Sequence, residues 1–187
     1  MRIRRYLPTD ERSWLRCRLL SFAQTCYYDD VRVARTLDDD IAVALVAVPD
    51  EPGGDEVLGL IDVTVDGTAA TIDSIAVHPD AQRRGLASAL LDAALAELPD
   101  GTATIDAWTR EDVPANSWYR TRGFVENYRY LHVYKGYDES EDGFATPEGL
   151  SGPVTAFLHA DIEWEAQLRA RYRRVYVCRQ YLRSLDT

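Results

Sequence analysis

Residues 68–98 constrain the fold of this chain more than any other segment. Residues 68–77 are rich in β-forming side chains, and the leucines and alanines of residues 86–98 gather on one helical face. Between them, residues 78–85 make a short polar loop that contains two arginines and a glycine. The segment is therefore expected to fold as a strand, a loop and a helix.

The start of that helix has the features of an anion-binding site. The first turn of a helix offers unpaired N–H groups and the positive end of the macrodipole. Gly85 allows close approach of the backbone, and the small Ala87 keeps the first turn open. Arg83 and Arg84 add positive charge, although a solvated basic loop is the alternative for both. A diphosphate fits this arrangement, and the sequence contains neither a GxxxxGK[ST] nor a GxGxxG motif.

The rest of the chain predicts an α/β fold with one mixed, mostly antiparallel sheet flanked by helices. The expected strands are residues 2–7, 41–48, 57–65, 68–77, 102–108, 124–134 and 174–182. The expected helices are residues 9–25, 86–98, 114–122 and 153–171. Asp66–Gly67 predicts a hairpin turn and residues 38–40 a polar turn, while residues 137–152 are expected to be an irregular, acidic loop.

The composition of the chain argues against several classes of ligand and partner. The net charge of −10 and the pI of about 4.7 argue against nucleic acid and allow either simple solubility or attraction of a cationic ligand. No apolar run is long enough to cross a membrane, and no leader segment is expected at the N-terminus. The scattered Cys17, Cys26 and Cys178 predict neither disulfides nor a zinc site, which favours the cytoplasm. His78, His132 and His159 show no metal-ligand spacing, so no metal is expected.

Two motifs give the chain a specific resemblance. Val77-x-Pro79 followed by Gln82-x-x-Gly85-x-Ala87 is similar to the coenzyme A loop of the GNAT-type N-acetyltransferases. Downstream, Ala115-x-x-Trp118-Tyr119-x-x-x-Gly123-Phe124 resembles the second motif of that family, in the right order and at the right distance. The resemblance covers residues 1–135, expected as an acyl-CoA-binding core. Residues 136–187 are expected as an extension on the same domain, with an insertion before the last strand.

The resemblance implies a set of residues that contact acetyl-CoA. The backbone amides of residues 82–87 would hold the pyrophosphate, and the strand that ends at residue 77 would pair with the pantetheine arm. Asp112 stands where the family often carries Asn, which puts that contact in doubt, and Asn116 is not at the matching position. The expected cofactor-binding residues are Ile75, Ala76, Val77, Gln82, Arg83, Arg84, Gly85, Leu86, Ala87, Asp112, Ala115, Trp118 and Tyr119.

Catalysis needs an acid and a base. The resemblance implies that Tyr119 protonates the departing thiolate, and a core aromatic is the alternative for this residue. Asp73 is the candidate base, because alternation places it on the strand face of Ile75 and Val77. A structural role as a backbone anchor is nearly as strong for Asp73, and Asp62 is the reserve candidate.

The acceptor is less defined. The aromatic and acidic stretch Tyr27, Tyr28, Asp29 and Asp30 follows the first helix, where the family commonly forms its acceptor wall; a capped helix end is the alternative. We expect transfer of an acetyl group from acetyl-CoA to a primary amine by direct attack in a ternary complex. The amine would belong to a small molecule or a protein and is expected to be cationic. A non-catalytic acyl-CoA sensor or structural subunit is the rival hypothesis, and a homodimer is left open.

Overall fold

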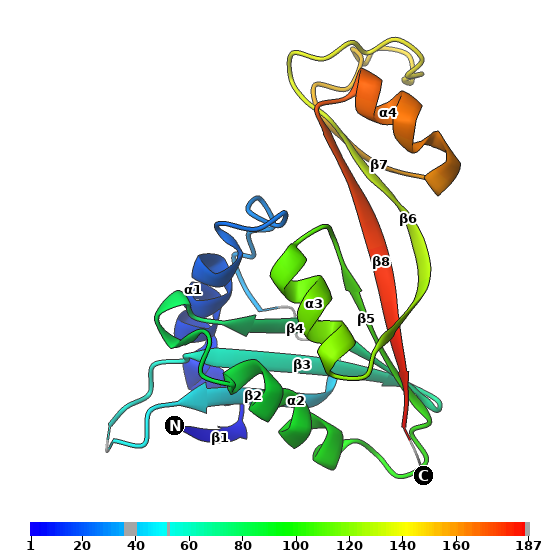
Figure 1. Cartoon of the computed structure of the whole chain (residues 1–187). Helices are drawn as coiled ribbons and strands as arrows, with labels where there is room; N and C mark the ends of the chain where they lie inside the picture. The colour runs from blue at the N-terminus through cyan, green and yellow to red at the C-terminus, as the bar shows by residue number, and fades with distance from the viewer. Residues whose placement is uncertain (36–40, 52, 186–187) are drawn as a thin grey trace.

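The computed structural model describes residues 1–35, 41–51 and 53–185, and within these one sheet of eight strands organises the fold (Figure 1). Its strands are β1 (Arg2–Arg5), β2 (Ile41–Val48), β3 (Gly59–Asp66), β4 (Ala69–Val77), β5 (Thr104–Thr109), β6 (Val125–Lys135), β7 (Ala156–Ala160) and β8 (Arg174–Ser184). The α-helices are α1 (Glu11–Phe22), α2 (Leu86–Glu97), α3 (Val113–Thr121) and α4 (Glu165–Arg171), and the short 3-10 helices are η1 (Pro8–Asp10), η2 (Pro79–Ala81) and η3 (Ile162–Trp164).

The strand order is β1-β2-β3-β4-β5-β8-β6-β7, and every neighbouring pair is antiparallel except β4 with β5. The predicted mixed, mostly antiparallel sheet is therefore confirmed. The predicted hairpin joins β3 and β4, but Asp66 pairs with Ala69 as the last residue of β3. The turn therefore lies at residues 67–68, where Gly67 has a φ of +58°, and not at Asp66–Gly67. The polar turn expected at residues 38–40 lies outside the described residues.

Helices cover both faces of the sheet. The apolar stripe of α2 packs on β2, β3 and β4, and it approaches β3 so closely that a Cβ on Gly59 would meet Leu90 Cδ1 at 2.9 Å. The fully buried Trp14 anchors α1 on the opposite face, against Val46, Val48 and Leu60. Figure 1 shows α2 and α3 on one side of the sheet and α1 on the other.

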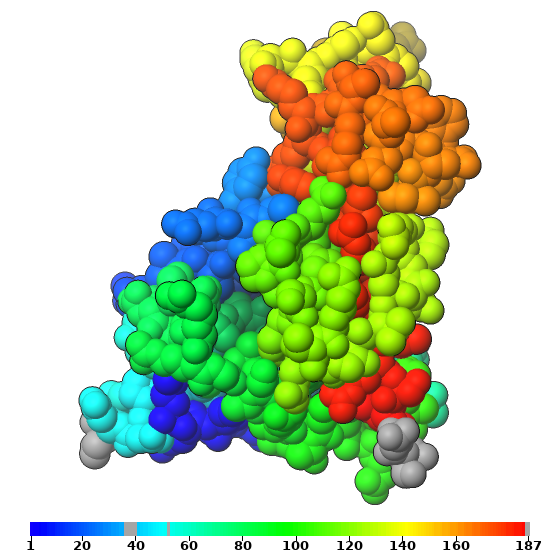
Figure 2. Space-filling view, in the orientation of Figure 1, coloured from blue at the N-terminus to red at the C-terminus, as the bar shows by residue number. Residues whose placement is uncertain are grey.

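The C-terminal part of the sheet projects beyond these helices as an arm, defined here as β6, β7, α4 and the adjoining half of β8 (Figures 1 and 2). Helix α4 covers one face of the arm, where Leu131, Val133, Tyr172, Val175 and Val177 form a separate apolar cluster. The other half of β8 runs back between β5 and β6. The arm is thus continuous with the central sheet through β8.

One predicted element is wrong. Residues 153–171 were expected to form a helix, but they contain β7, η3 and only the short α4. Residues 156–160 alternate between the two faces of the arm, with Leu158 on the apolar cluster and Phe157 and His159 on the other face. Residues 137–152 contain no helix or strand, as predicted. None of the described helices is long and apolar enough to cross a membrane.

Candidate active site

The site begins where β4 and β5 separate. Their parallel pairing runs from Ala69 with Thr104 to Ile72 with Ala107, and no further pair follows. Both strands continue, β4 to Val77 and β5 to Thr109. The backbone of β4 after Ile72 therefore has hydrogen-bonding groups free on its β5 side, which suits an extended ligand that adds to the strand edge.

A β-bulge lies at the same point. On β3, Asp62 pairs with Ser74 and Val63 pairs with Ile72, so Asp73 has no partner. An inserted residue bends the strand and re-aims a side chain. Here Ile72 stays in the core that α2 covers, while Asp73 faces the gap between the strands together with Ile75 and Val77.

The loop before α2 has two left-handed residues. Arg83 has a φ of +60° and Gly85 one of +77°, and the Gln82 side chain donates to the Val77 carbonyl at 3.1 Å. No side chain caps the helix at Gly85, and its first turn carries no acidic residue. A Cβ on Gly85 would have no atom within 4 Å. The positive φ, rather than crowding within the chain, is therefore what favours glycine here.

These features border one cavity of about 500 Å³. All the predicted cofactor-binding residues except Arg84 line this cavity, and Asp73 lines it as well. Those residues are Ile75, Ala76, Val77, Gln82, Arg83, Gly85, Leu86, Ala87, Asp112, Ala115, Trp118 and Tyr119. The exposed side chain of Arg84 lies outside the cavity lining, since the loop turns only Arg83 toward the cavity.

Tyr119 forms one wall of the cavity from α3. Its ring stacks on Tyr181 at 5.5 Å and meets Phe124 and Trp118 edge to face. Burial raises the pKa of Tyr119 above its ordinary value, so the hydroxyl keeps its proton at neutral pH. The Trp118 indole donates to Ser88 Oγ at 3.2 Å, which fixes α3 against the first turn of α2. Tyr119 is thus both a core aromatic and a residue facing the cavity.

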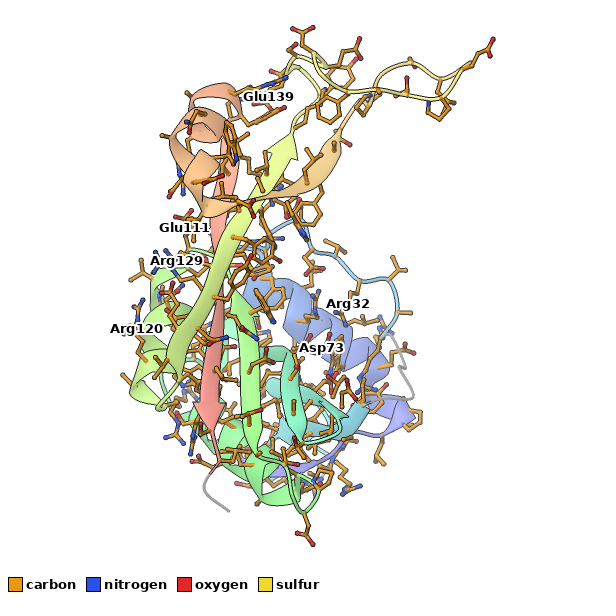
Figure 3. All side chains as sticks on the ribbon, turned by 90° about the vertical axis from the view of Figure 1, so that its right-hand side faces the viewer. Arg32, Asp73, Glu111, Arg120, Arg129 and Glu139 are labelled. Carbon is orange, nitrogen blue, oxygen red and sulfur yellow. The ribbon has the colours of Figure 1, made fainter. Side chains whose placement is uncertain are left out.

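Asp73 also borders the cavity, and it lies beside Arg32 (Figure 3). Arg32 Nη1 is 3.4 Å from Asp73 Oδ2, and the Ser74 hydroxyl donates to the same oxygen at 3.1 Å. Both members of the ion pair are partly exposed, so the pair is loose and open to exchange with a ligand. The reserve candidate Asp62 is instead buried and held by Arg35 at 2.8 and 3.1 Å, outside the cavity.

The predicted acceptor residues divide into two groups. Tyr27 and Asp30 border the cavity, whereas Tyr28 and Asp29 do not. Asp29 pairs with Arg174 of β8, and the Arg174 guanidinium also lies 4.5 Å from the centre of the Tyr28 ring. The placement of these two residues in the acceptor wall is therefore not supported; they attach the segment after α1 to the arm.

Asp112 and Asn116 have structural contacts at the start of α3. The Asp112 carboxylate accepts the Cys26 N–H at 2.9 Å. The Asn116 amide donates to the carbonyls of Arg110 and Asp112, and its oxygen accepts the Tyr181 hydroxyl at 2.9 Å. Asp112 still borders the cavity, but one of its carboxylate oxygens already has a partner.

Several residues of the site were not predicted from the sequence. Arg18, Arg32 and Trp108 all border the cavity. Trp108 carried a usable signal, because it ends the expected strand 102–108. Arg18 and Arg32 carried none, since their positions depend on α1 and the segment after it. Arg18 is neutralised by Asp30, which it contacts at 2.7 and 2.9 Å. Among the described residues, no group of three or more His, Cys, Asp or Glu side chains could hold a metal ion.

Residues 39–126 match the family model described as an acetyltransferase (GNAT) domain. A mycothiol acetyltransferase from Mycolicibacterium gilvum (strain PYR-GCK) is 43% identical over 67 residues, which are 35% of this chain and 22% of that protein. The chain thus matches only about a fifth of that relative's length.

Two solved structures show the same fold. The ribosomal-protein-S18-alanine N-acetyltransferase of Escherichia coli aligns with a TM-score of 0.61 and 16% identity, over 100% of this chain and 94% of that one. The PaiA N-acetyltransferase of Thermoplasma acidophilum, solved in complex with coenzyme A, aligns with a TM-score of 0.58 and 14% identity, over 67% of this chain and 90% of that one.

Proposed function

The chain belongs, over residues 39–126, to the acetyltransferase (GNAT) domain family, and from this premise we propose that it transfers an acetyl group from acetyl-CoA to an amine. The observation that carries the proposal is the single cavity that joins the free edge of β4 to the uncapped start of α2. A ligand with a diphosphate at one end and an extended, amide-containing arm at the other fits both features.

The residues of the cavity fit acetyl-CoA in named roles. The amides of the first turn of α2, together with Arg83, would hold the pyrophosphate. The main chain of residues 75–77 would pair with the pantetheine arm, which brings the thioester toward Tyr119. Arg84 is left out of this set, because it does not border the cavity.

The chemistry proposed is direct attack in a ternary complex. The amine nitrogen forms a bond to the thioester carbon, the carbon–sulfur bond breaks, and the thiolate takes the hydroxyl proton of Tyr119. The acceptor arrives as an ammonium group and gives one proton to Asp73, directly or through water, before it attacks; the nitrogen loses its second proton to water after attack, and Tyr119 regains a proton from water. Burial keeps Tyr119 protonated before the reaction, and the loose Arg32 pair leaves Asp73 accessible to an incoming ammonium group. No covalent acyl-enzyme is needed.

One observation favours a second candidate function. Asp112 replaces the Asn that the family often carries, and its carboxylate is engaged by the Cys26 amide. A chain that binds acyl-CoA without turnover would tolerate this change. The cationic acceptor, an association into homodimers and the cytoplasm are further proposals; the last is supported by the free thiols of Cys17, Cys26 and Cys178.

Two measurements, made one after the other, test the proposed function. Coenzyme A at 100 times its dissociation constant is expected to stabilise the native protein by about 2.7 kcal/mol, seen as a rise in melting temperature. Release of free thiol from acetyl-CoA is then measured with a panel of amines. An unmoved melting temperature would overturn acyl-CoA binding, whereas binding with no thiol release from any amine would favour the sensor.

A further inference from the structure

We infer, on the basis of the proposed acetyl transfer, that the acceptor is a linear polyamine whose second ammonium group binds in an aromatic box beside the cavity. The box consists of Trp108 on β5, Tyr128 and Tyr130 on β6, and His159 on β7, with Asp161 at its rim. These residues and Ala160 line a second hollow of about 460 Å³.

The rings pack against one another and together line the hollow. Trp108 lies edge to face with Tyr128 at 6.2 Å and with Tyr130 at 5.5 Å between ring centres. His159 lies edge to face with Tyr130 at 4.8 Å. Trp108 is 39% exposed and Tyr128 52%, so their faces are open to a ligand. Tryptophan and tyrosine faces attract ammonium groups within about 6 Å of the ring centre.

The hollow has acidic residues beside it, while the arginines of the same face are engaged elsewhere. Asp161 borders the hollow, and Asp106 lies two residues before Trp108, on the same face of β5. Arg110, two residues after Trp108, donates to His132, Tyr134 and the Cys26 carbonyl, and Arg174 pairs with Asp29. Arg129 and Arg179 occupy the alternate positions of β6 and β8, where both pair with Glu126. Figure 3 shows Arg129 on the side of α3, away from Asp73.

The same face already binds cations elsewhere along its length. The Arg110 guanidinium lies 4.0 Å from the centre of the Tyr27 ring, and the Arg174 guanidinium lies 3.8 Å from that of Tyr134. In the part of the chain that the structure describes, no arginine or lysine stacks on Trp108, Tyr128 or Tyr130. These rings are therefore available to a cation from solution.

Trp108 connects the box to the reaction site, because it borders both the cavity and the second hollow. Ile72 and Ala107 are the last pair of β4 and β5, so Asp73 and Trp108 are the first residues of the opening. The box lies over β8, two strands from β4, which is a distance of at least about 10 Å, since the usual strand spacing is a lower bound where β4 and β5 have separated. A linear amine with charges at that separation would place one nitrogen at Asp73 and the other in the box.

The experiment compares acceptors that differ only in the distal charge. Thiol release from acetyl-CoA is measured with diaminooctane, with octylamine as the matched monoamine, with diaminopropane and with a lysine peptide. For the wild type, kcat/KM for diaminooctane is expected to exceed that for octylamine by at least about tenfold, a ratio worth about 1.4 kcal/mol. Diaminopropane is too short to reach both sites and is expected to be a poor substrate.

Variants then locate the effect. Tyr128→Ala and Asp161→Asn each lower the ratio of diaminooctane to octylamine, whereas Trp164→Ala, an equally exposed aromatic of η3 that borders neither hollow, leaves it unchanged. Equal use of octylamine and diaminooctane, an unchanged ratio in Tyr128→Ala, or a preference for the lysine peptide would overturn the inference.

A binding measurement separates this inference from the proposed function. Calorimetry of diaminooctane with the protein saturated by coenzyme A needs no turnover. Binding that is lost in Tyr128→Ala supports the box even if no amine is acetylated, a result that would contradict the transferase alone. Binding that Tyr128→Ala leaves unchanged overturns the box even if acetylation is observed.

Discussion

Tyr119 has two roles, because its ring packs in the core and its side chain also borders the cavity. Tyr119→Phe keeps the ring and removes only the proton donor. A thiol of pKa about 8.5 is a fair leaving group unaided, so we expect kcat to fall by about 10²-fold, the low end for general acid catalysis. Single-turnover thiol release measures this effect.

The matched control for Tyr119→Phe is Tyr137→Phe, at an exposed position outside the cavity. The control is expected to leave kcat unchanged. The affinity for coenzyme A is expected to stay within about threefold of the wild type in both variants, well below the tenfold change that about 1.4 kcal/mol would give. The reason is that the Tyr119 hydroxyl acts on the sulfur only after attack. An unchanged kcat in Tyr119→Phe would leave the core aromatic as its only role.

Asp73 is tested by its dependence on pH. An alkylamine with a pKa near 10.4 is almost fully protonated at pH 7 and has no lone pair to attack with. Asp73→Asn is expected to lower kcat/KM by about 10²-fold at pH 7, and the defect is expected to shrink as the pH approaches 10, where the amine loses its proton without help. Asp66→Asn, at the exposed end of β3, serves as the control. A defect that is constant with pH would identify Asp73 as a positioning residue.

His132 gives a prediction about stability. Burial and the neighbouring Arg110 lower the pKa of His132 to about 4, whereas the unfolded chain has an ordinary value near 6.5. Between these values the unfolded state binds the proton and the folded state does not. The free energy of unfolding should therefore fall as the pH drops from 6.5 to 4, by up to about 1.4 kcal/mol per pH unit. His132→Gln should lose this component. Urea titrations at several pH values should therefore show that the free energy of unfolding of the variant changes less between pH 6.5 and 4 than that of the wild type.

At the scale of elements, local patterns succeeded where one face of an element is buried. The leucine stripe of 86–98 is α2, which buries one face, and the continuous apolar run 41–48 is β2, which is buried on both faces. The segment 153–171 failed because a five-residue alternating strand at the sheet edge is easily read as part of a helix. Its pairing partner, β6, lies about 25 residues away and was not visible in the local pattern.

Gly85 allows the loop before α2 to be tested as an element. Gly85→Ala forces a side chain into the left-handed region, which costs about 1–2 kcal/mol of folding free energy. Gly101→Ala is a matched control, since Gly101 has a φ of +85° and equally open surroundings. Both variants should lose similar stability, but only Gly85→Ala should weaken coenzyme A binding, by about tenfold. Equal affinities in calorimetry would remove the loop from the binding site.

At the scale of the whole molecule, the site depends on contacts between distant parts of the chain. The loop, the strand that becomes β4 and the helix that carries Tyr119 were predicted from motif residues that lie close together in the sequence, whereas the bulge at Asp73 was not predicted. Tyr28 and Asp29 could not be placed, because their partner Arg174 comes 145 residues after Asp29. The aromatic box could not be predicted from the sequence either, because its rings come from three strands that meet only when β8 enters the sheet.

The position of β8 leads to the last prediction. Residues 1–135 contain every motif residue, yet β8 pairs with β5 on one side and with β6 on the other. Its fully buried Tyr181 stacks on Tyr119 and donates to Asn116. A chain that ends at residue 136 would expose the edges of β5 and β6 and remove this ring from the core. We therefore expect it to show no cooperative unfolding transition, although the cofactor loop is intact.

The control keeps β8 and changes the irregular loop. Replacing residues 143–151 with a glycine–serine segment of equal length alters no helix or strand. This variant is therefore expected to unfold cooperatively, with a free energy of unfolding within about 1 kcal/mol of the wild type. Circular dichroism during heating compares the two chains. If the shortened chain unfolds cooperatively and binds coenzyme A, residues 1–135 are an independent domain. If only the loop variant does so, residues 136–187 belong to the same folding unit, because the central sheet is incomplete until its last strand is in place.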